Sequence, residues 1–128
     1  MVMDVVSERV AGYLVPSTTI VQTNGVGAPF ELGQLAGQPL LIVLRIHEVI
    51  EQESLRLSVW GSPDAVEWGD RPLFWFPEMF YPGLKPAALN LSQYSQIKFL
   101  QARWEVNRWG RGWPRPFFKI SAEVQHLD

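Results

Sequence analysis

Apolar and polar residues alternate through two segments near the end of the sequence, 97–107 and 118–124. A period of two puts every second side chain on the same face of a β-strand, so one face of each segment is apolar. The apolar positions are Leu100, Ala102, Trp104, Val106, Phe118, Ile120, Ala122 and Val124. The pattern predicts two antiparallel strands, joined as a hairpin by the loop 108–116.

The same alternation predicts two strands in the middle of the sequence, at 40–49 and 55–60. The expected inward positions are Leu40, Ile42, Leu44 and Ile46 in the first and Leu55, Leu57 and Val59 in the second. Arg56, Ser58 and Trp60 are then expected to point outward from the second strand.

Shorter strands are expected at 18–23, 28–32, 73–76 and 86–91. The dipeptide Asn24-Gly25 indicates a two-residue hairpin turn with positive φ, which would pair the first two of these strands. Prolines at positions 77 and 82 confine 78–81 to an edge strand or a loop. Residues 1–12 are expected to form a short helical or irregular arm.

Seven or eight short strands separated by Gly, Pro and Asn turns, without a long amphipathic helix, define the expected fold class. The chain is predicted to be all-β, an antiparallel β-sandwich of jelly-roll-like form. At 128 residues, it is expected to be one domain spanning 1–128.

Composition limits the kinds of partner and site that the sequence can be expected to have. The formal net charge of −2 gives no support to nucleic-acid binding, and the absence of cysteine leaves no disulfide or thiolate site. The longest aliphatic run, 40–44, is far too short to span a membrane. No basic and then apolar segment opens the sequence, so no Sec signal peptide is expected. The localisation stays open on these grounds.

Few residues suit catalysis. His47 and His126 are the only histidines, and neither has a second ligand at a spacing typical of a zinc site. The acids between Glu48 and Glu53 could pair as in glycosidases, but such a turn is more often simply solvated. We therefore expect no enzyme activity, no metal and no cofactor.

Six tryptophans exceed what a core of this size requires. Trp68 and Trp104 are interpreted as structural and are expected to be largely buried in the core. Trp60, Trp75, Trp109 and Trp113 are predicted to point outward or to lie in loops. Exposed rings can stack on sugars or anchor a protein interface. The arginines that accompany the rings favour the interface, because Arg pairs with carboxylates and stacks on aromatic faces. These arginines are Arg108, Arg111 and Arg115. The alternative is that some rings, Trp75 for example, cover an open end of the sandwich.

Charge is segregated along the chain. The middle carries the acids Glu48, Glu51, Glu53 and Asp70, and the C-terminal part carries the bases Arg108, Arg111, Arg115 and Lys119. One interpretation is a head-to-tail contact in which the basic surface of one copy meets the acidic surface of the next. The other is that acidic and basic strands are neighbours within one sheet and neutralise each other.

The most distinctive motif is Ser-Pro-Asp-Ala-Val-Glu-Trp at 62–68, in which Ser62 and Asp64 can cap a tight turn that Trp68 covers. It resembles the Ser-Pro-Asp-Gly-x-x-Trp turn of phage and phage-like β-sandwich proteins. It is more distantly similar to the Asp-box of sialidases, from which it departs by lacking the Gly and by being one residue shorter. In these families the motif is a structural turn.

The resemblance to small phage and prophage virion proteins extends over about 39–124 and is carried by 40–46, 55–64, 100–106 and 116–120. It implies a structural subunit of a virion or comparable particle.

The sequence therefore predicts a non-enzymatic assembly protein: a subunit of a phage-like particle, tail or other array. Its partners would be further copies of itself, head to tail, or other particle proteins, with no nucleic acid and no membrane. The alternative is a carbohydrate-binding module that uses the exposed tryptophans, and a third option is an accessory or inhibitor-like binding domain.

Overall fold

Nine β-strands make up most of the residues that the computed structural model describes, which are 10–49, 53–108 and 117–127. The strands are β1 (Val10–Val21), β2 (Gly25–Val26), β3 (Phe30–Glu31), β4 (Pro39–Val49), β5 (Glu53–Ser62), β6 (Phe74–Trp75), β7 (Gly83–Asn90), β8 (Phe99–Arg108) and β9 (Phe118–His126). Two short 3₁₀ turns, η1 (Gly33–Leu35) and η2 (Leu91–Gln93), complete the regular structure, and the described residues contain no α-helix.

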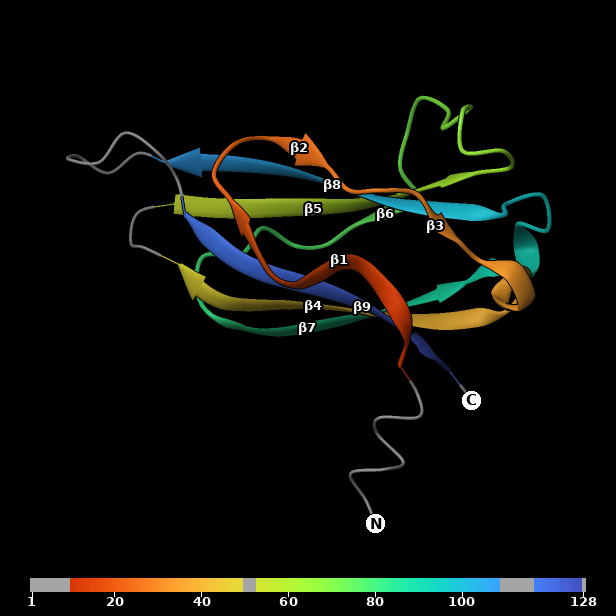
Figure 1. Cartoon of the computed structure of the whole chain (residues 1–128), viewed down its shortest axis with the longest axis horizontal. Helices are drawn as coiled ribbons and strands as arrows, with labels where there is room; N and C mark the ends of the chain where they lie inside the picture. The colour runs from red at the N-terminus through yellow and green to blue at the C-terminus, as the bar shows by residue number, and fades with distance from the viewer. Residues whose placement is uncertain (1–9, 50–52, 109–116, 128) are drawn as a thin grey trace, which may run out of the picture.

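The strands form two antiparallel sheets that lie on one another (Figure 1). The first sheet has the order β1-β9-β4-β7, and the second has the order β2-β8-β5-β6, with β3 also paired to β8. The chain passes from one sheet to the other after β1, β3, β4, β6, β7 and β8. Such repeated crossing between a four-stranded and a five-stranded sheet resembles the topology of a jelly roll. The expected all-β antiparallel sandwich is thus confirmed.

The core lies between the sheets and consists of the inward positions of four long strands. The alternation predicted this correctly, since every expected inward side chain of β4, β5 and β9 is buried. In β8 the burial is complete for Leu100 and Ala102. Burying one such aliphatic or aromatic side chain contributes about 1.5–3 kcal/mol, so these strands supply most of the apolar stabilisation.

The predicted C-terminal hairpin is wrong. β8 lies in the second sheet beside β2, β3 and β5, whereas β9 lies in the first sheet between β1 and β4. The segment 109–116 that joins them lies outside the described residues. Both strands show the expected alternation, but alternation specifies only which face of a strand is buried and leaves the pairing partner open.

The hairpin predicted at Asn24-Gly25 is also wrong. β1 pairs with β9, whereas β2 and β3 pair with β8, and neither residue of the dipeptide has positive φ. Instead, the Asn24 side chain accepts a hydrogen bond from the Val106 backbone N–H at 2.8 Å. A Cβ on Gly25 would lie 3.0 Å from Nε1 of Trp104, so glycine here permits close packing beneath the indole ring.

Three further expectations need correction. The arm expected over residues 1–12 is not irregular at residues 10–12, because β1 begins at Val10. Residues 1–9 lie outside the described residues. Trp104 is half-buried against the rim of the core rather than inside it. Trp68 is also half-buried and does not belong to the core cluster.

Candidate functional site

The outer face of the second sheet collects aromatic and arginine side chains. Residues paired across neighbouring strands point to the same side of a sheet. Ser58 of β5 is paired with Arg103 on one side and Trp75 on the other, and Leu57 and Val59 of the same strand point into the core. One outward row therefore runs from Arg103 through Ser58 to Trp75. We call this surface, made by Arg56, Ser58, Trp60, Trp75, Gln101 and Arg103, the tryptophan–arginine face.

Two arginines stack on two tryptophans on this face. The Arg103 Cζ lies 4.0 Å from the ring centroid of Trp60, and the Arg56 Cζ lies 4.3 Å from that of Trp75. Each stack contributes about 0.5–1 kcal/mol at an exposed site. Trp75 keeps 39% of its surface exposed, so a large part of this aromatic–cationic surface faces solvent.

Hydrogen bonds fix the arrangement of the face. Trp60 Nε1 donates to Ser58 Oγ at 2.9 Å, and Arg103 Nε donates to Gln101 Oε1 at 3.0 Å. Gln101 Nε2 in turn donates to the backbone carbonyl of Gly27 at 3.0 Å. Ser58 and Gln101 are buried although they lie on the outer side of the sheet. The Trp60 ring and the Arg103 guanidinium are thus held in place before any partner binds.

The structure brings together only part of the predicted interface. Trp60 and Trp75 both lie on the tryptophan–arginine face, but Trp109, Arg111, Trp113 and Arg115 lie outside the described residues. No binding role was assigned to Arg56 or Arg103 from the sequence, although the alternation places both on the polar faces of their strands. The signal that could have found them is the same alternation, since an outward Arg on one strand can reach an outward Trp on the next.

Most of the predicted charge-complementary residues that the structure describes pair within the chain. Glu53 has a side chain with no exposed surface, and its Oε1 lies 3.9 Å from Arg108 Nη1 and accepts a hydrogen bond from the Phe117 N–H at 2.8 Å. Glu48 Oε2 lies 2.7 Å from Lys119 Nζ.

In both pairs the acid and the base are cross-strand neighbours in one sheet. These four residues fit the interpretation in which acidic and basic strands neutralise each other within a sheet. The Glu53 carboxylate is buried and cannot take part in a contact surface. Glu51 lies outside the described residues.

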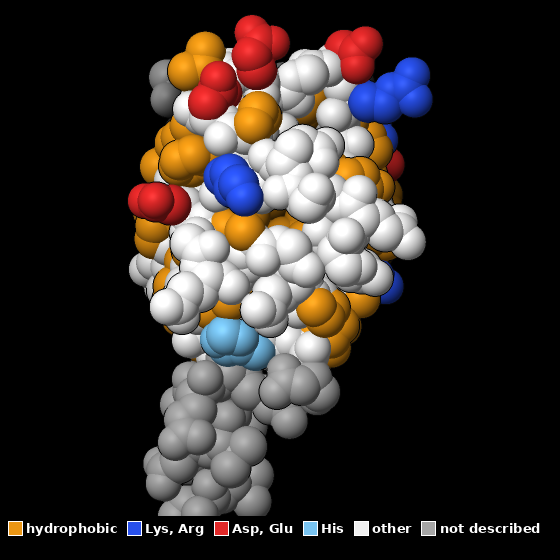
Figure 2. Space-filling model, turned by 90° about the vertical axis from the view of Figure 1, so that its right-hand side faces the viewer, with side chains coloured by type: hydrophobic (Ala, Val, Ile, Leu, Met, Phe, Trp, Pro, Cys, Tyr) orange, Lys and Arg blue, Asp and Glu red, His pale blue; other side chains and the backbone are white. Residues whose placement is uncertain are grey.

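Asp70 remains exposed, in the loop 63–73 between β5 and β6. Figure 2 views the end of the molecule at which this loop projects, and acidic side chains gather along the upper rim of that end. Asp64, Glu67 and Asp70 are the acids of the loop, and all three are exposed.

The first part of this loop is a capped turn. Ser62 Oγ accepts hydrogen bonds from the N–H groups of Asp64 and Ala65 and donates to Asp64 Oδ1 at 3.1 Å. Asp64 Oδ1 accepts from the N–H groups of Val66 and Glu67, both at 2.9 Å. The bonds from Glu67 and Val66 hold the pKa of the Asp64 carboxyl below its ordinary value. These contacts give Ser62 and Asp64 the turn-forming geometry expected of the motif.

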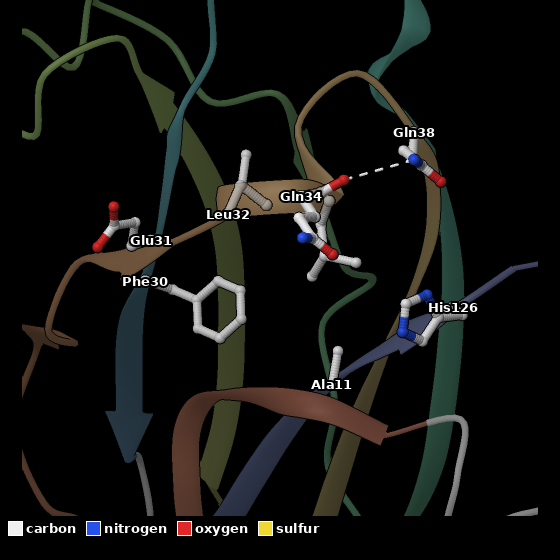
Figure 3. A pocket seen from close by; sticks show the side chains of 8 residues that line it. Ala11, Phe30, Glu31, Leu32, Gln34, Gln38 and His126 are labelled. Atoms are coloured by element: carbon white, nitrogen blue, oxygen red, sulfur yellow. Dashed lines mark hydrogen bonds between the residues drawn. The ribbon is translucent and has the colours of Figure 1, made fainter.

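A pocket of about 540 Å³ opens at one end of the sandwich, where η1 and β3 approach β1 and β9 (Figure 3). The side chains of Phe30, Gln34, His126 and Ala11 surround its central space, while the carboxylate of Glu31 is directed away from it. An aromatic wall with amide and imidazole groups that can form hydrogen bonds suits a small polar molecule.

Comparison with known proteins gives no further guide. No model of a known protein family matches the chain, and neither does any curated protein. Within 10–49, 53–108 and 117–127, no group of three or more His, Asp or Glu side chains could hold a metal ion. None of the helices in this part of the chain has the length and apolar character needed to cross a membrane.

Proposed function

We propose that this chain is a non-enzymatic assembly protein, a subunit of a phage-like particle, tail or other protein array. The tryptophan–arginine face is its contact surface. The observation that carries the proposal is the presence of two Arg–Trp stacks side by side on an outer sheet face. Trp and Arg dominate the residues that contribute most to binding at protein interfaces.

Two further features support this proposal. The face is held by hydrogen bonds, so little side-chain freedom is lost when a partner binds. An arginine already covers part of each ring, which favours a partner that offers acidic and flat groups over a sugar that needs the bare ring. The jelly-roll topology is compatible with a particle subunit but also with many other functions.

The proposal is tested by truncating the exposed ring. Trp75→Ala should weaken self-association by about 2 kcal/mol, or roughly 30-fold in the dissociation constant, because it removes an interface anchor. Light scattering on a sizing column across a concentration series measures this effect. The thermal midpoint should change little, since the ring is substantially exposed.

Tyr13→Ala is the matched control. Tyr13 is 43% exposed and lies on β1 of the other sheet, so its loss should leave association unchanged. A parent protein that stays monomeric at every concentration would contradict self-assembly. Equal effects of the two variants would remove the tryptophan–arginine face from the contact.

The alternative function is carbohydrate binding, and the pocket at the end of the sandwich is the observation that favours it. Its Phe30 ring and the hydrogen-bonding groups of Gln34 and His126 could hold a sugar unit. In that case the protein would be retarded on a polysaccharide gel, and Phe30→Ala would abolish the retardation while Trp75→Ala would not.

A further inference from the structure

The guanidinium of Arg103 is fixed in place, while its two terminal nitrogens, Nη1 and Nη2, remain available to a partner. Its guanidinium lies on the ring of Trp60, and its Nε is already used by Gln101. In the part of the chain that the structure describes, no carboxylate lies within ion-pairing distance of either Nη. Arg56, the other arginine of the face, differs because its Nη1 lies 3.9 Å from Glu105.

A guanidinium held in this way is suited to a carboxylate. Its planar fork can form two parallel hydrogen bonds with the two oxygens of one carboxyl group. Since stacking and the Gln101 bond already restrict the side chain, binding requires little further ordering. The geometry of Arg103 thus defines the chemistry of what it binds, an exposed carboxylate on a protein segment.

The same chain carries a segment with this chemistry. The loop 63–73 presents Glu67 and Asp70, both exposed, and neither carboxylate has an ion-pair partner within the described residues. Beside them lies Val66, which is 74% exposed and offers an apolar contact. Asp64 is different because its Oδ1 is taken up by the turn itself, which holds the segment in shape.

The loop forms no ion pair with Arg103 within one molecule, in the part of the chain that the structure describes. Arg103 pairs with Ser58 from the β8 side of β5, whereas the loop leaves β5 after Ser62 and rejoins the sheet on the other side of β5, where Phe74 pairs with Val59. The carboxylates of the loop are therefore available to another molecule.

We propose that Arg103 of one copy binds the exposed carboxylates of the loop 63–73, Glu67 and Asp70, of a second copy. This inference rests on the proposed function and specifies the contact through which assembly occurs. The two surfaces differ in charge, so like charges do not face each other as they would if one patch met its own copy. Such contacts can close a dimer or continue head to tail.

The test uses two reversed variants, alone and mixed. Arg103→Glu, and the double variant Glu67→Lys with Asp70→Lys, should each raise the dissociation constant for self-association about tenfold or more, because each opposes like charges. In an equimolar mixture, the intact Arg103 of one variant meets the intact loop of the other, and the reversed pair is also complementary. The mixture should therefore associate within about threefold of the parent.

The thermal midpoint of each variant is measured first. The loop variant changes only exposed side chains and is expected to fold, so its effect is interpretable even if Arg103→Glu disturbs the packing on Trp60. Arg103→Lys keeps the charge without the fork and should also weaken association.

If the parent and the loop variant assemble equally well, the contact between Arg103 and the loop is wrong. The proposed assembly function would not be contradicted by that result. A mixture that associates no better than its components would also overturn the contact. A parent that never self-associates would contradict both.

Discussion

Ala65 has a left-handed backbone conformation, with φ of 65°. This conformation costs most L-residues about 1–2 kcal/mol, and glycine adopts it freely. The Ser-Pro-Asp-Gly-x-x-Trp turn that this motif resembles has Gly at this position. Ala65→Gly should therefore raise the free energy of unfolding by about 0.5 kcal/mol, after allowing for the greater freedom of Gly in the unfolded chain. Urea unfolding followed by tryptophan fluorescence measures the change.

Ala88→Gly is the matched control for this substitution. Ala88 lies in β7 and does not have positive φ, so glycine there should lower the free energy of unfolding by about 0.5–1 kcal/mol. If Ala65→Gly were as destabilising as Ala88→Gly, the left-handed turn at 65 would be wrong.

Asp64 makes the stability of the same turn depend on pH. Hydrogen bonds from the Glu67 and Val66 N–H groups keep its folded-state pKa below the ordinary value of 3.8. The carboxylate therefore stabilises the folded chain fully above pH 3.8, and this contribution is lost as the pH falls through the lower, folded-state pKa. Thermal midpoints of the parent and of Asp64→Ala should differ by a constant amount near neutral pH and converge in acid.

Asp64→Asn separates the charge from the hydrogen bonds at this position. The amide keeps an acceptor oxygen but does not titrate, so the contribution from position 64 should become independent of pH. A gap between the parent and Asp64→Ala that widened in acid would contradict the lowered pKa.

For individual residues, the sequence predicted which side of a strand a side chain faces better than it predicted which other side chains it contacts. Outward placement of Trp60 followed from strand alternation, whereas Trp75 was predicted only to point outward or to lie in a loop. The stacking of these rings with Arg103 and Arg56 did not follow from alternation, because it depends on the register between β5, β6 and β8. A shift of one residue in that register would have turned the arginines to the other face.

The buried carboxylate of Glu53 connects three strands, β5, β8 and β9. Glu53 begins β5, pairs with Arg108 at the end of β8, and accepts a hydrogen bond from Phe117 just before β9. Removing one partner of a buried ion pair leaves an uncompensated charge in the interior. Glu53→Ala should therefore lower the free energy of unfolding by about 3 kcal/mol.

Glu48→Ala is the control for this prediction. Its pair with Lys119 is shorter, but 59% of the Glu48 side chain is exposed, and such surface pairs contribute less than about 1 kcal/mol. Chemical unfolding of the two variants measures the contrast. Similar losses for both would show that burial does not govern the strength of the Glu53 pair.

The strands themselves were largely predictable, and their pairing was not. β5 follows from alternation, and β4 follows from an aliphatic run that gives way to alternation after Leu44. The inward core positions of both strands follow with them. The first hairpin was inferred from the Asn24-Gly25 turn signal, and the second was inferred from the adjacency of β8 and β9 in the sequence, which is a sound rule for meanders. A jelly roll breaks this rule, because its chain changes sheet at nearly every connection.

In the molecule as a whole, some charged side chains pair within the chain and others form no ion pair among the described residues. The pairs Glu48–Lys119 and Glu53–Arg108 neutralise four of the segregated charges inside one chain. Arg103 on the tryptophan–arginine face and the acids of the loop 63–73 are among the described charges that form no ion pair. The sequence could show that charge was segregated, but only the sheet order shows which charges are left for a partner.

The place of β9 between β1 and β4 has a consequence for how the protein is made. The first strand of the described fold pairs with the last, from Val10 opposite Gln125 to Val21 opposite Phe118. During synthesis, β1 and β4 have no strand between them until β9, Phe118–His126, has been translated. Folding that depends on such distant pairings is slow. A chain that ends before residue 118 would expose two unpaired strand edges and would be prone to aggregate with its neighbours.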